Sequence, residues 1–182
     1  PAAQTYSLTA GGVTRRVVIE GNGPGIIFMP GGDQTAEGYT QQVARLARDF
    51  RCISYDPRGA GDTVSPPAPW TMGDYAQDCA AIIDEFCGGR AIVCGLSLGG
   101  LVTQQVAIDF PDKVSLAIPM GTSAYIDGFT RDWMQAEIDI RKAGIELPDF
   151  FLAPHYAPYA FPAKALHDPD LWAEIKPAYT LR

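Results

Sequence analysis

Val93-Cys94-Gly95-Leu96-Ser97-Leu98-Gly99-Gly100 places one serine between two glycines, each two residues away from it. Residues 91–94 before it are apolar, as in a buried strand, and residues 98–110 after it have the apolar pattern of a helix. A serine on such a sharp strand-to-helix turn exposes its hydroxyl, and the tight turn favours neighbours that lack a Cβ. We therefore predict that Ser97 is a catalytic nucleophile on a nucleophile elbow.

Strand and helix patterns alternate along the chain before and after this elbow. A hairpin over residues 5–20 is expected first, and a helix over residues 71–86 begins with Thr71 and Asp74 at capping-box spacing. Repeated alternation of this kind is typical of an α/β sandwich with a mostly parallel sheet. The other strands are expected at residues 25–29, 51–55, 91–94 and 114–118.

The pattern changes after Gly121. A helix is expected over residues 130–143, then a segment rich in proline and aromatic residues, then a short helix with Asp168 as its N-cap and Pro169 at its first position. We predict two parts, a core over residues 1–121 and a cap or lid segment over residues 122–182.

Composition excludes several classes of partner. The net charge of −7 argues against binding to nucleic acid or to an anionic membrane surface. The apolar runs are much shorter than the roughly 18 residues that a membrane span needs. No metal-ligand spacing and no cofactor motif is evident. The expected free thiols (Cys52, Cys79, Cys87 and Cys94) and the lack of a secretion signal favour a cytoplasmic protein.

Three motifs follow one another in an order that is familiar from one large family. They are Met29-Pro30-Gly31-Gly32-Asp33, the segment from Tyr55 to Thr63, and Gly95-Leu96-Ser97-Leu98-Gly99-Gly100. With them the chain resembles the N-terminal two-thirds of an α/β-hydrolase, a superfamily that includes esterases, lactonases, C–C hydrolases and haloperoxidases. The resemblance implies a mostly parallel sheet with helices on both faces, without its last strands, together with part of a helical cap.

The resemblance also implies an oxyanion hole. In this family two backbone N–H groups hold the oxyanion, one in the loop after the first buried strand and one directly after the nucleophile. The matching residues here are Gly32 and Leu98, whereas Pro30 stands where the family usually has a histidine. Two such amides stabilise a tetrahedral intermediate without any cofactor or metal.

A serine nucleophile also needs a base and usually an acid, and here the chain is puzzling. Its two histidines, His155 and His167, both fall in the expected cap, where packing or surface roles are the better prediction. Asp56 precedes the nucleophile and is expected to be structural, because the acid of this family follows it. Asp127 would match a minority arrangement of the family.

Two explanations for the missing groups stay open. In the first, a C-terminal fragment of the same hydrolase supplies the histidine and the aspartate, and the end at Leu181-Arg182 fits cleavage in an exposed loop. In the second, the chain is an inactive relative that only binds a ligand. We favour the first, because a parallel sheet without its last strands would expose an apolar edge.

The resulting prediction is a serine hydrolase that cleaves a carboxylic ester or a lactone through an acyl-enzyme on Ser97. Cap aromatic residues such as Trp133 and Phe150 favour a small to medium hydrophobic substrate. C–C bond hydrolysis, acyl transfer and haloperoxidation use the same residues and remain alternatives. No nucleic acid, membrane, metal or organic cofactor is expected to take part.

Overall fold

The computed structural model describes residues 2–32 and 34–179 of the chain. The chain divides into two compact units, Pro1–Ala124 and Tyr125–Arg182, which we call the core unit and the helical unit. The first contains every strand of the described residues, and the second contains helices only. No helix among the described residues is long and apolar enough to cross a lipid bilayer.

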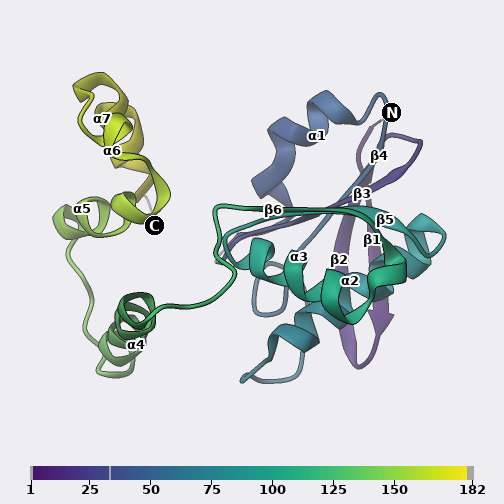
Figure 1. Ribbon diagram of the computed structural model, residues 1–182, viewed down its shortest axis with the longest axis horizontal. Coiled ribbons are helices and arrows are strands. Elements are labelled where there is room, and N and C mark those ends of the chain that lie inside the picture. The colour runs from purple at the N-terminus through teal and green to yellow at the C-terminus, as the bar shows by residue number, and fades with distance from the viewer. Residues whose placement is uncertain (1, 33, 180–182) are drawn as a thin grey trace. The chain divides into compact units, whose positions relative to one another are not determined.

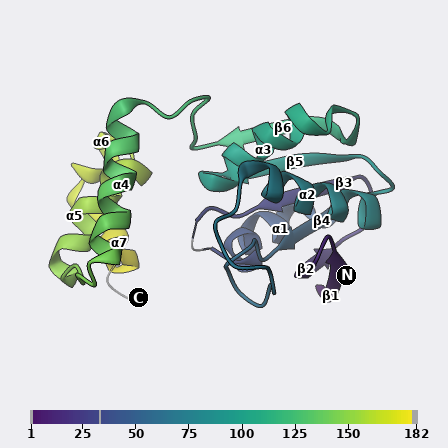
Figure 2. The ribbon, with the colours of Figure 1, turned by 90° about the horizontal axis from the view of Figure 1, so that it is seen from below.

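The described residues of the core unit form a six-stranded sheet in the order β1-β2-β4-β3-β5-β6. β1, β2 and β4 pair antiparallel, and β4, β3, β5 and β6 pair parallel. Figure 2 shows β1 and β6 at opposite edges of this sheet. The strands are β1 (Gln4–Ala10), β2 (Val13–Glu20), β3 (Gly25–Met29), β4 (Arg51–Tyr55), β5 (Ala91–Leu96) and β6 (Val114–Met120).

Helices cover both faces of the sheet, as the sequence predicts (Figure 1). One face packs on α1 (Thr40–Leu46) and the preceding 3-10 turn η1 (Ala36–Tyr39), and its core contains Phe28, Tyr39, Val43 and Cys52. The other face packs on α2 (Met72–Cys87) and α3 (Leu98–Asp109), and its core contains Ile27, Ile53, Ile82 and Val106. A further 3-10 turn, η2 (Pro111–Lys113), leads from α3 into β6. The fold is the expected open, mostly parallel α/β sandwich.

α2 shows how closely the local sequence determines an element. The Thr71 hydroxyl accepts a hydrogen bond from the Asp74 N–H at 3.2 Å, and the Asp74 carboxylate accepts one from the Thr71 N–H at 2.7 Å. This is the capping box that the spacing of Thr71 and Asp74 predicts. The helix ends at Gly88, whose φ of 63° is the left-handed conformation that favours glycine.

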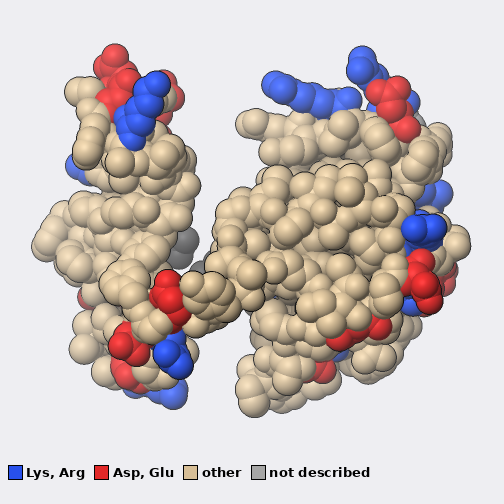
Figure 3. Space-filling view, viewed as in Figure 1, with Lys and Arg blue, Asp and Glu red and all other residues tan. Residues whose placement is uncertain are grey.

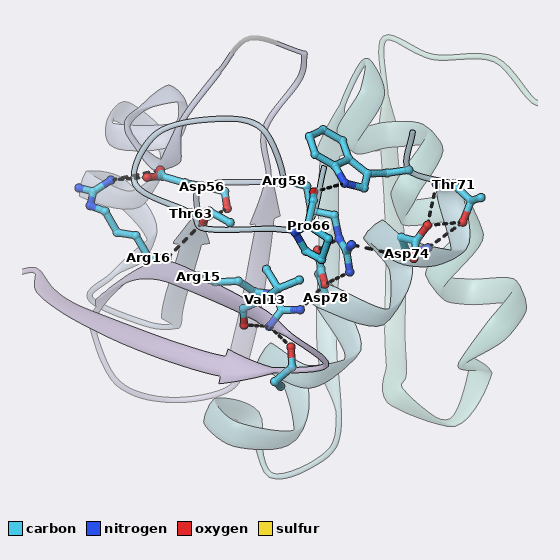
Figure 4. A network of polar contacts seen from close by, with 12 residues as sticks. Val13, Arg15, Arg16, Asp56, Arg58, Thr63, Pro66, Thr71, Asp74 and Asp78 are labelled. Carbon is cyan, nitrogen blue, oxygen red and sulfur yellow. Dashed lines mark hydrogen bonds and ion pairs between the residues drawn. The ribbon is translucent and has the colours of Figure 1, made fainter. Parts of the chain in front are cut away.

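A buried ionic network links β2 to α2 (Figure 4). Arg15 occupies an inward-facing position of β2 between Val13 and Val17, and only 2% of the residue is exposed. Its guanidinium pairs with Asp78 of α2, and Asp78 also accepts hydrogen bonds from Arg58 at 2.6 and 3.0 Å. Because a buried charge needs a partner, an arginine among inward-facing valines is a sequence signal for this network.

The helical unit consists of α4 (Gly128–Lys142), α5 (Asp149–Ala160), α6 (Ala163–Leu166), α7 (Pro169–Ile175) and the 3-10 turn η3 (Lys176–Tyr179). α7 begins as predicted, because the Asp168 carboxylate accepts hydrogen bonds from the N–H groups of Asp170 and Leu171 at 3.0 and 3.2 Å. α5 was not predicted, since Pro154 and Pro158 lie inside it. It buries Ala153 and Ala157 on one face, and this packing offsets the poor helical sequence.

Candidate active site

Ser97 lies on a strained turn between β5 and α3. Its φ of 55° is the one positive φ of a non-glycine residue among the described residues, and its ψ is −115°. Such a conformation costs about 1–3 kcal/mol and persists only where the surroundings hold it. Here the Ser97 N–H donates to the Met120 carbonyl at 3.0 Å, and the Ser97 carbonyl accepts from the Gly100 N–H at 2.9 Å. The residue is exposed, so its hydroxyl is accessible.

The glycines of the elbow are required by close backbone approach. A Cβ on Gly95 would collide with the Gly99 carbonyl and lie 2.6 Å from the Thr103 hydroxyl. A Cβ on Gly99 would collide with the Met29 carbonyl at the end of β3. The buried Thr103 hydroxyl donates to the Gly99 carbonyl at 2.8 Å and ties α3 to its own first turn. The elbow therefore packs directly against the end of β3.

The loop after β3 is held beside Ser97. A Cβ on Gly31 would lie 3.5 Å from the Ser97 Cβ, so the two backbones are neighbours. The Gly31 N–H donates to the Gln34 side-chain oxygen at 2.9 Å, and the Gln34 N–H donates to the Gly31 carbonyl at 3.3 Å. The buried Tyr39 hydroxyl donates to the Met29 carbonyl at 3.1 Å. Gln34 and Tyr39 thus position this loop, a role that the sequence prediction missed.

These contacts limit which backbone N–H groups are available near Ser97. The Gly31 N–H is occupied by Gln34, whereas the exposed Gly32 has no hydrogen bond to another described residue. Leu98 is the first residue of α3, where an N–H has no acceptor within the helix. The role of Gly32 and Leu98 in an oxyanion hole stays a prediction, and both residues keep an N–H without an acceptor among the described residues. Asp33, the last residue of the loop motif, lies outside the described residues.

Asp56 is buried and saturated with hydrogen bonds (Figure 4). Its carboxylate accepts from the backbone N–H groups of Ala36 and Asp62, both at 2.9 Å, and from the Arg16 guanidinium at 3.1 Å. A Cβ on Gly61 would collide with this carboxylate, so the loop after β4 wraps closely around it. Asp56 organises this loop, in agreement with the structural role predicted for it.

Both histidines lie in the helical unit. His155 Nε2 lies 2.6 Å from Glu137 Oε1, and the imidazole stacks between Trp133 and Phe151 at ring-centroid distances of 5.6 and 5.0 Å. The Tyr156 hydroxyl donates to the other Glu137 oxygen at 2.5 Å. Burial raises the pKa of Glu137, but these hydrogen bonds outweigh it and lower the pKa. His155 is thus built into the packing of α4 on α5.

The remaining predicted residues are also placed. His167 follows α6 and is exposed. Asp127 is the N-cap of α4, where its carboxylate accepts a hydrogen bond from the Thr130 N–H at 2.7 Å. Leu181 and Arg182 lie outside the described residues. Within the part of the chain that is described, no group of three or more His, Cys, Asp or Glu residues could hold a metal ion.

Comparison with known proteins identifies the family of this chain. The model of the alpha/beta hydrolase family matches residues 26–181. The 3-oxoadipate enol-lactonase 2 of Acinetobacter baylyi is 30% identical over 122 residues, which are 67% of this chain and 45% of the lactonase. The human mitochondrial palmitoyl-protein thioesterase ABHD10 is 32% identical over 131 residues, which are 68% of this chain and 41% of the thioesterase. The chain thus spans less than half the length of either relative.

A solved structure gives the same result for the fold. The crystal structure of a hydrolase from Pseudomonas aeruginosa PA01 matches 97% of this chain and 66% of its own with a TM-score of 0.74 and 25% sequence identity. The family match covers most of the chain, and the mostly parallel sheet with helices on both faces agrees with it. The chain belongs to the alpha/beta hydrolase family.

Proposed function

We propose that this chain carries the nucleophile and the oxyanion hole of a serine hydrolase that cleaves a carboxylic ester or a lactone. The observation that carries the proposal is the positive φ of Ser97. A serine with no chemical role would gain stability by leaving this conformation, whereas a nucleophile gains an exposed hydroxyl from it.

The chemistry follows from the groups around the elbow. Ser97 Oγ attacks the carbonyl carbon of the substrate, and the Gly32 and Leu98 N–H groups stabilise the oxyanion. The base takes the Ser97 hydroxyl proton during the attack and gives it to the leaving oxygen as the C–O bond breaks, so an ester releases its alcohol and a lactone opens to an acyl group that carries a hydroxyl. The same base then takes a proton from water, which attacks the acyl group and releases the acid and free Ser97. The loss of one such donor typically costs about 3 kcal/mol of transition-state stabilisation. The hydrogen bond between Gln34 and Gly31 should therefore affect the rate, because it positions the loop that carries the Gly32 N–H.

The base and the acid are proposed to come from a C-terminal part of the same hydrolase, because the core unit contains no histidine. The exposed edge strand β6 supports this proposal. Leu116 and Met120 on β6 are 53% and 36% exposed, and Ile108 near the end of α3 is 71% exposed. In Figure 3 a broad area of the core unit, on the side where α3 and β6 face the viewer in Figure 1, carries no Lys, Arg, Asp or Glu. Further strands and helices would cover such a surface.

The substrate class is supported by the relatives and by the helical unit. One relative is named as a lactonase and another as a thioesterase, and both names describe cleavage at an acyl carbon. The helical unit exposes aromatic side chains, with Phe129, Phe150 and Tyr159 at 68%, 77% and 51%. These observations favour a small to medium hydrophobic acyl group over a highly charged one.

A fluorophosphonate probe tests the nucleophile. We expect it to label Ser97 when the chain is purified together with its C-terminal complement, and we expect Ser97→Ala to abolish labelling. Ser115→Ala is the matched control, because Ser115 is also exposed but lies on β6 away from the elbow. A complete absence of labelling with the complement present would overturn the proposed serine hydrolase and favour the alternative of a non-catalytic binding protein.

Intact-mass analysis of the co-purified material tests the origin of the base. A second polypeptide of roughly 80 to 120 residues, with a histidine near its C-terminal end, would complete a hydrolase domain of typical size. A folded, monomeric chain that is labelled by the probe without any partner would refute the proposal that the base is supplied from outside.

A further inference from the structure

A cavity of about 440 Å³ lies at the end of the sheet opposite to Ser97. It is formed where β3, β4, β5 and β6 begin and where α2 ends. Its lining includes Gly25, Arg51 and Ala91, the first residues of β3, β4 and β5, and Ser115, the second residue of β6. Ser97 follows the far end of the six-residue strand β5, so it is roughly 20 Å away at about 3.3 Å per residue. The cavity is therefore separate from the proposed active site.

The charges around this cavity are unbalanced. Arg51 and Arg90 line it, and no described Asp or Glu does. Among the described residues of the core unit, every other Lys or Arg except Arg45 forms an ion pair with a carboxylate. Nε of Arg51 is buried and has no hydrogen-bond partner among the described residues. Of the three cations in this described part of the core unit that have no carboxylate partner, two thus share one cavity.

No described carboxylate nearby lines the cavity: Glu85 precedes Phe86 on α2 and is exposed, but it is not part of the lining. Asp49 pairs with Arg48 at 2.8 Å, and Asp84 pairs with Lys113. Glu20 lines a different cavity, together with residues of η1 and α1 that cover the other face of the sheet. The C-terminal end of α2 directs a negative partial charge of about half an electron toward the strand starts, which is small against two arginines. The cavity therefore retains a net positive charge.

The lining and the volume of the cavity indicate the size and polarity of its ligand. Phe86, Ile92 and Pro24 give it apolar surface, and its volume lies within the roughly 300–1,000 Å³ of small-molecule sites. A guanidinium group matches a carboxylate with two parallel hydrogen bonds. We propose that this cavity binds a small organic carboxylate, with its apolar body against Phe86 and its carboxylate on Arg51 and Arg90. This inference does not depend on the role of Ser97.

Benzoate is the probe that tests the proposal, with benzamide as its uncharged analogue and inorganic phosphate as an anion without an apolar body. We expect saturable binding of benzoate to the purified chain in an NMR titration, and much weaker binding of the other two. Arg51→Gln and Arg90→Gln should each weaken benzoate binding roughly tenfold or more, since each removes a charge-assisted hydrogen bond. Arg45→Gln is the matched control and should change nothing, because Arg45 is exposed and lies outside the cavity.

Cys87 offers a second readout, because it lines the cavity and is half-buried while Cys52, Cys79 and Cys94 are buried. Benzoate should slow the alkylation of Cys87 by N-ethylmaleimide, and Arg90→Gln should remove this protection. Arg90 is exposed, so its substitution leaves the fold intact even if Arg51→Gln does not. Equal binding of benzamide, binding of phosphate alone, or unchanged benzoate affinity in Arg90→Gln would each overturn the proposal.

Discussion

β1 and β6 are the two edge strands of one sheet, and each is seven residues long. Both are largely exposed, but β1 reads QTYSLTA and β6 reads VSLAIPM. Polar side chains suit β1 to water, whereas β6 exposes the kind of apolar residues that other strands bury. β1 therefore suits an edge that faces water, whereas β6 has the surface expected if the proposed C-terminal part pairs with it.

The buried interior between these edges should contribute most of the free energy of unfolding. Substitution of Asp78 should have the largest effect on this free energy. Asp78→Asn would leave Arg15 and Arg58 without their shared carboxylate, and Arg15 is almost fully buried. We expect the free energy of unfolding in urea to fall by about 3–5 kcal/mol. Asp84→Asn, on the exposed side of the same helix, should cost at most about 1 kcal/mol. Equal losses in the two variants would contradict a buried network.

A pair of truncations compares the interior with the β6 edge directly. Ile27→Ala on β3 removes a fully buried side chain and should cost about 2–5 kcal/mol. Leu116→Ala on β6 removes a half-exposed one and should stay within about 0.5 kcal/mol. Urea unfolding of both variants gives the two values. If Leu116→Ala cost as much as Ile27→Ala, β6 would be packed rather than exposed.

Self-association of the chain should depend on β6 and not on β1. Leu116→Lys places a charge on the apolar edge and should weaken self-association at least about tenfold, because burial of one leucine contributes about 1.5–3 kcal/mol. Thr5→Lys is the matched variant on β1 and should have no effect, because Thr5 is already polar and exposed. Sedimentation at several concentrations measures both. A larger effect of Thr5→Lys than of Leu116→Lys on self-association would show that the chain associates through β1 and not through β6.

Near β1, the charged side chain of Arg16 on β2 pairs with Glu37 within the chain. The dependence of stability on pH tests this pair. The hydrogen bond from Arg16 of β2 lowers the pKa of Glu37 from 4.5 to about 2. A lowered pKa stabilises the folded state above about pH 4.5, and this contribution is lost as the pH falls toward 2. Glu37→Gln should remove this part of the acid dependence, an effect below about 1 kcal/mol because the Glu37 side chain is 58% exposed. If the free energy of unfolding of Glu37→Gln still fell with pH as steeply as that of the wild type, other carboxylates would be the cause of the acid dependence.

Local chemistry explains which elements could be predicted. The capping box of Thr71 and Asp74 and the cap at Asp168 act within three residues, so the sequence reveals them. α5 could not be predicted, because Pro154 and Pro158 oppose a helix and only packing of Ala153 and Ala157 favours it. The Gln34 contact with Gly31 was missed because it concerns the side chain of one loop residue, whose direction no sequence pattern indicates.

By itself, the sequence determined the alternation of strands and helices, the elbow at Ser97 and its resemblance to the α/β-hydrolases, since periodicity and turn chemistry act over a few residues. Only the tertiary structure decided the ion pair of Arg15 with Asp78, 63 residues apart, the availability of Gly32 beside the occupied Gly31, and the two unpaired arginines at the strand starts. The physical reason is that such contacts depend on which residues the folded sheet brings together from distant parts of the chain.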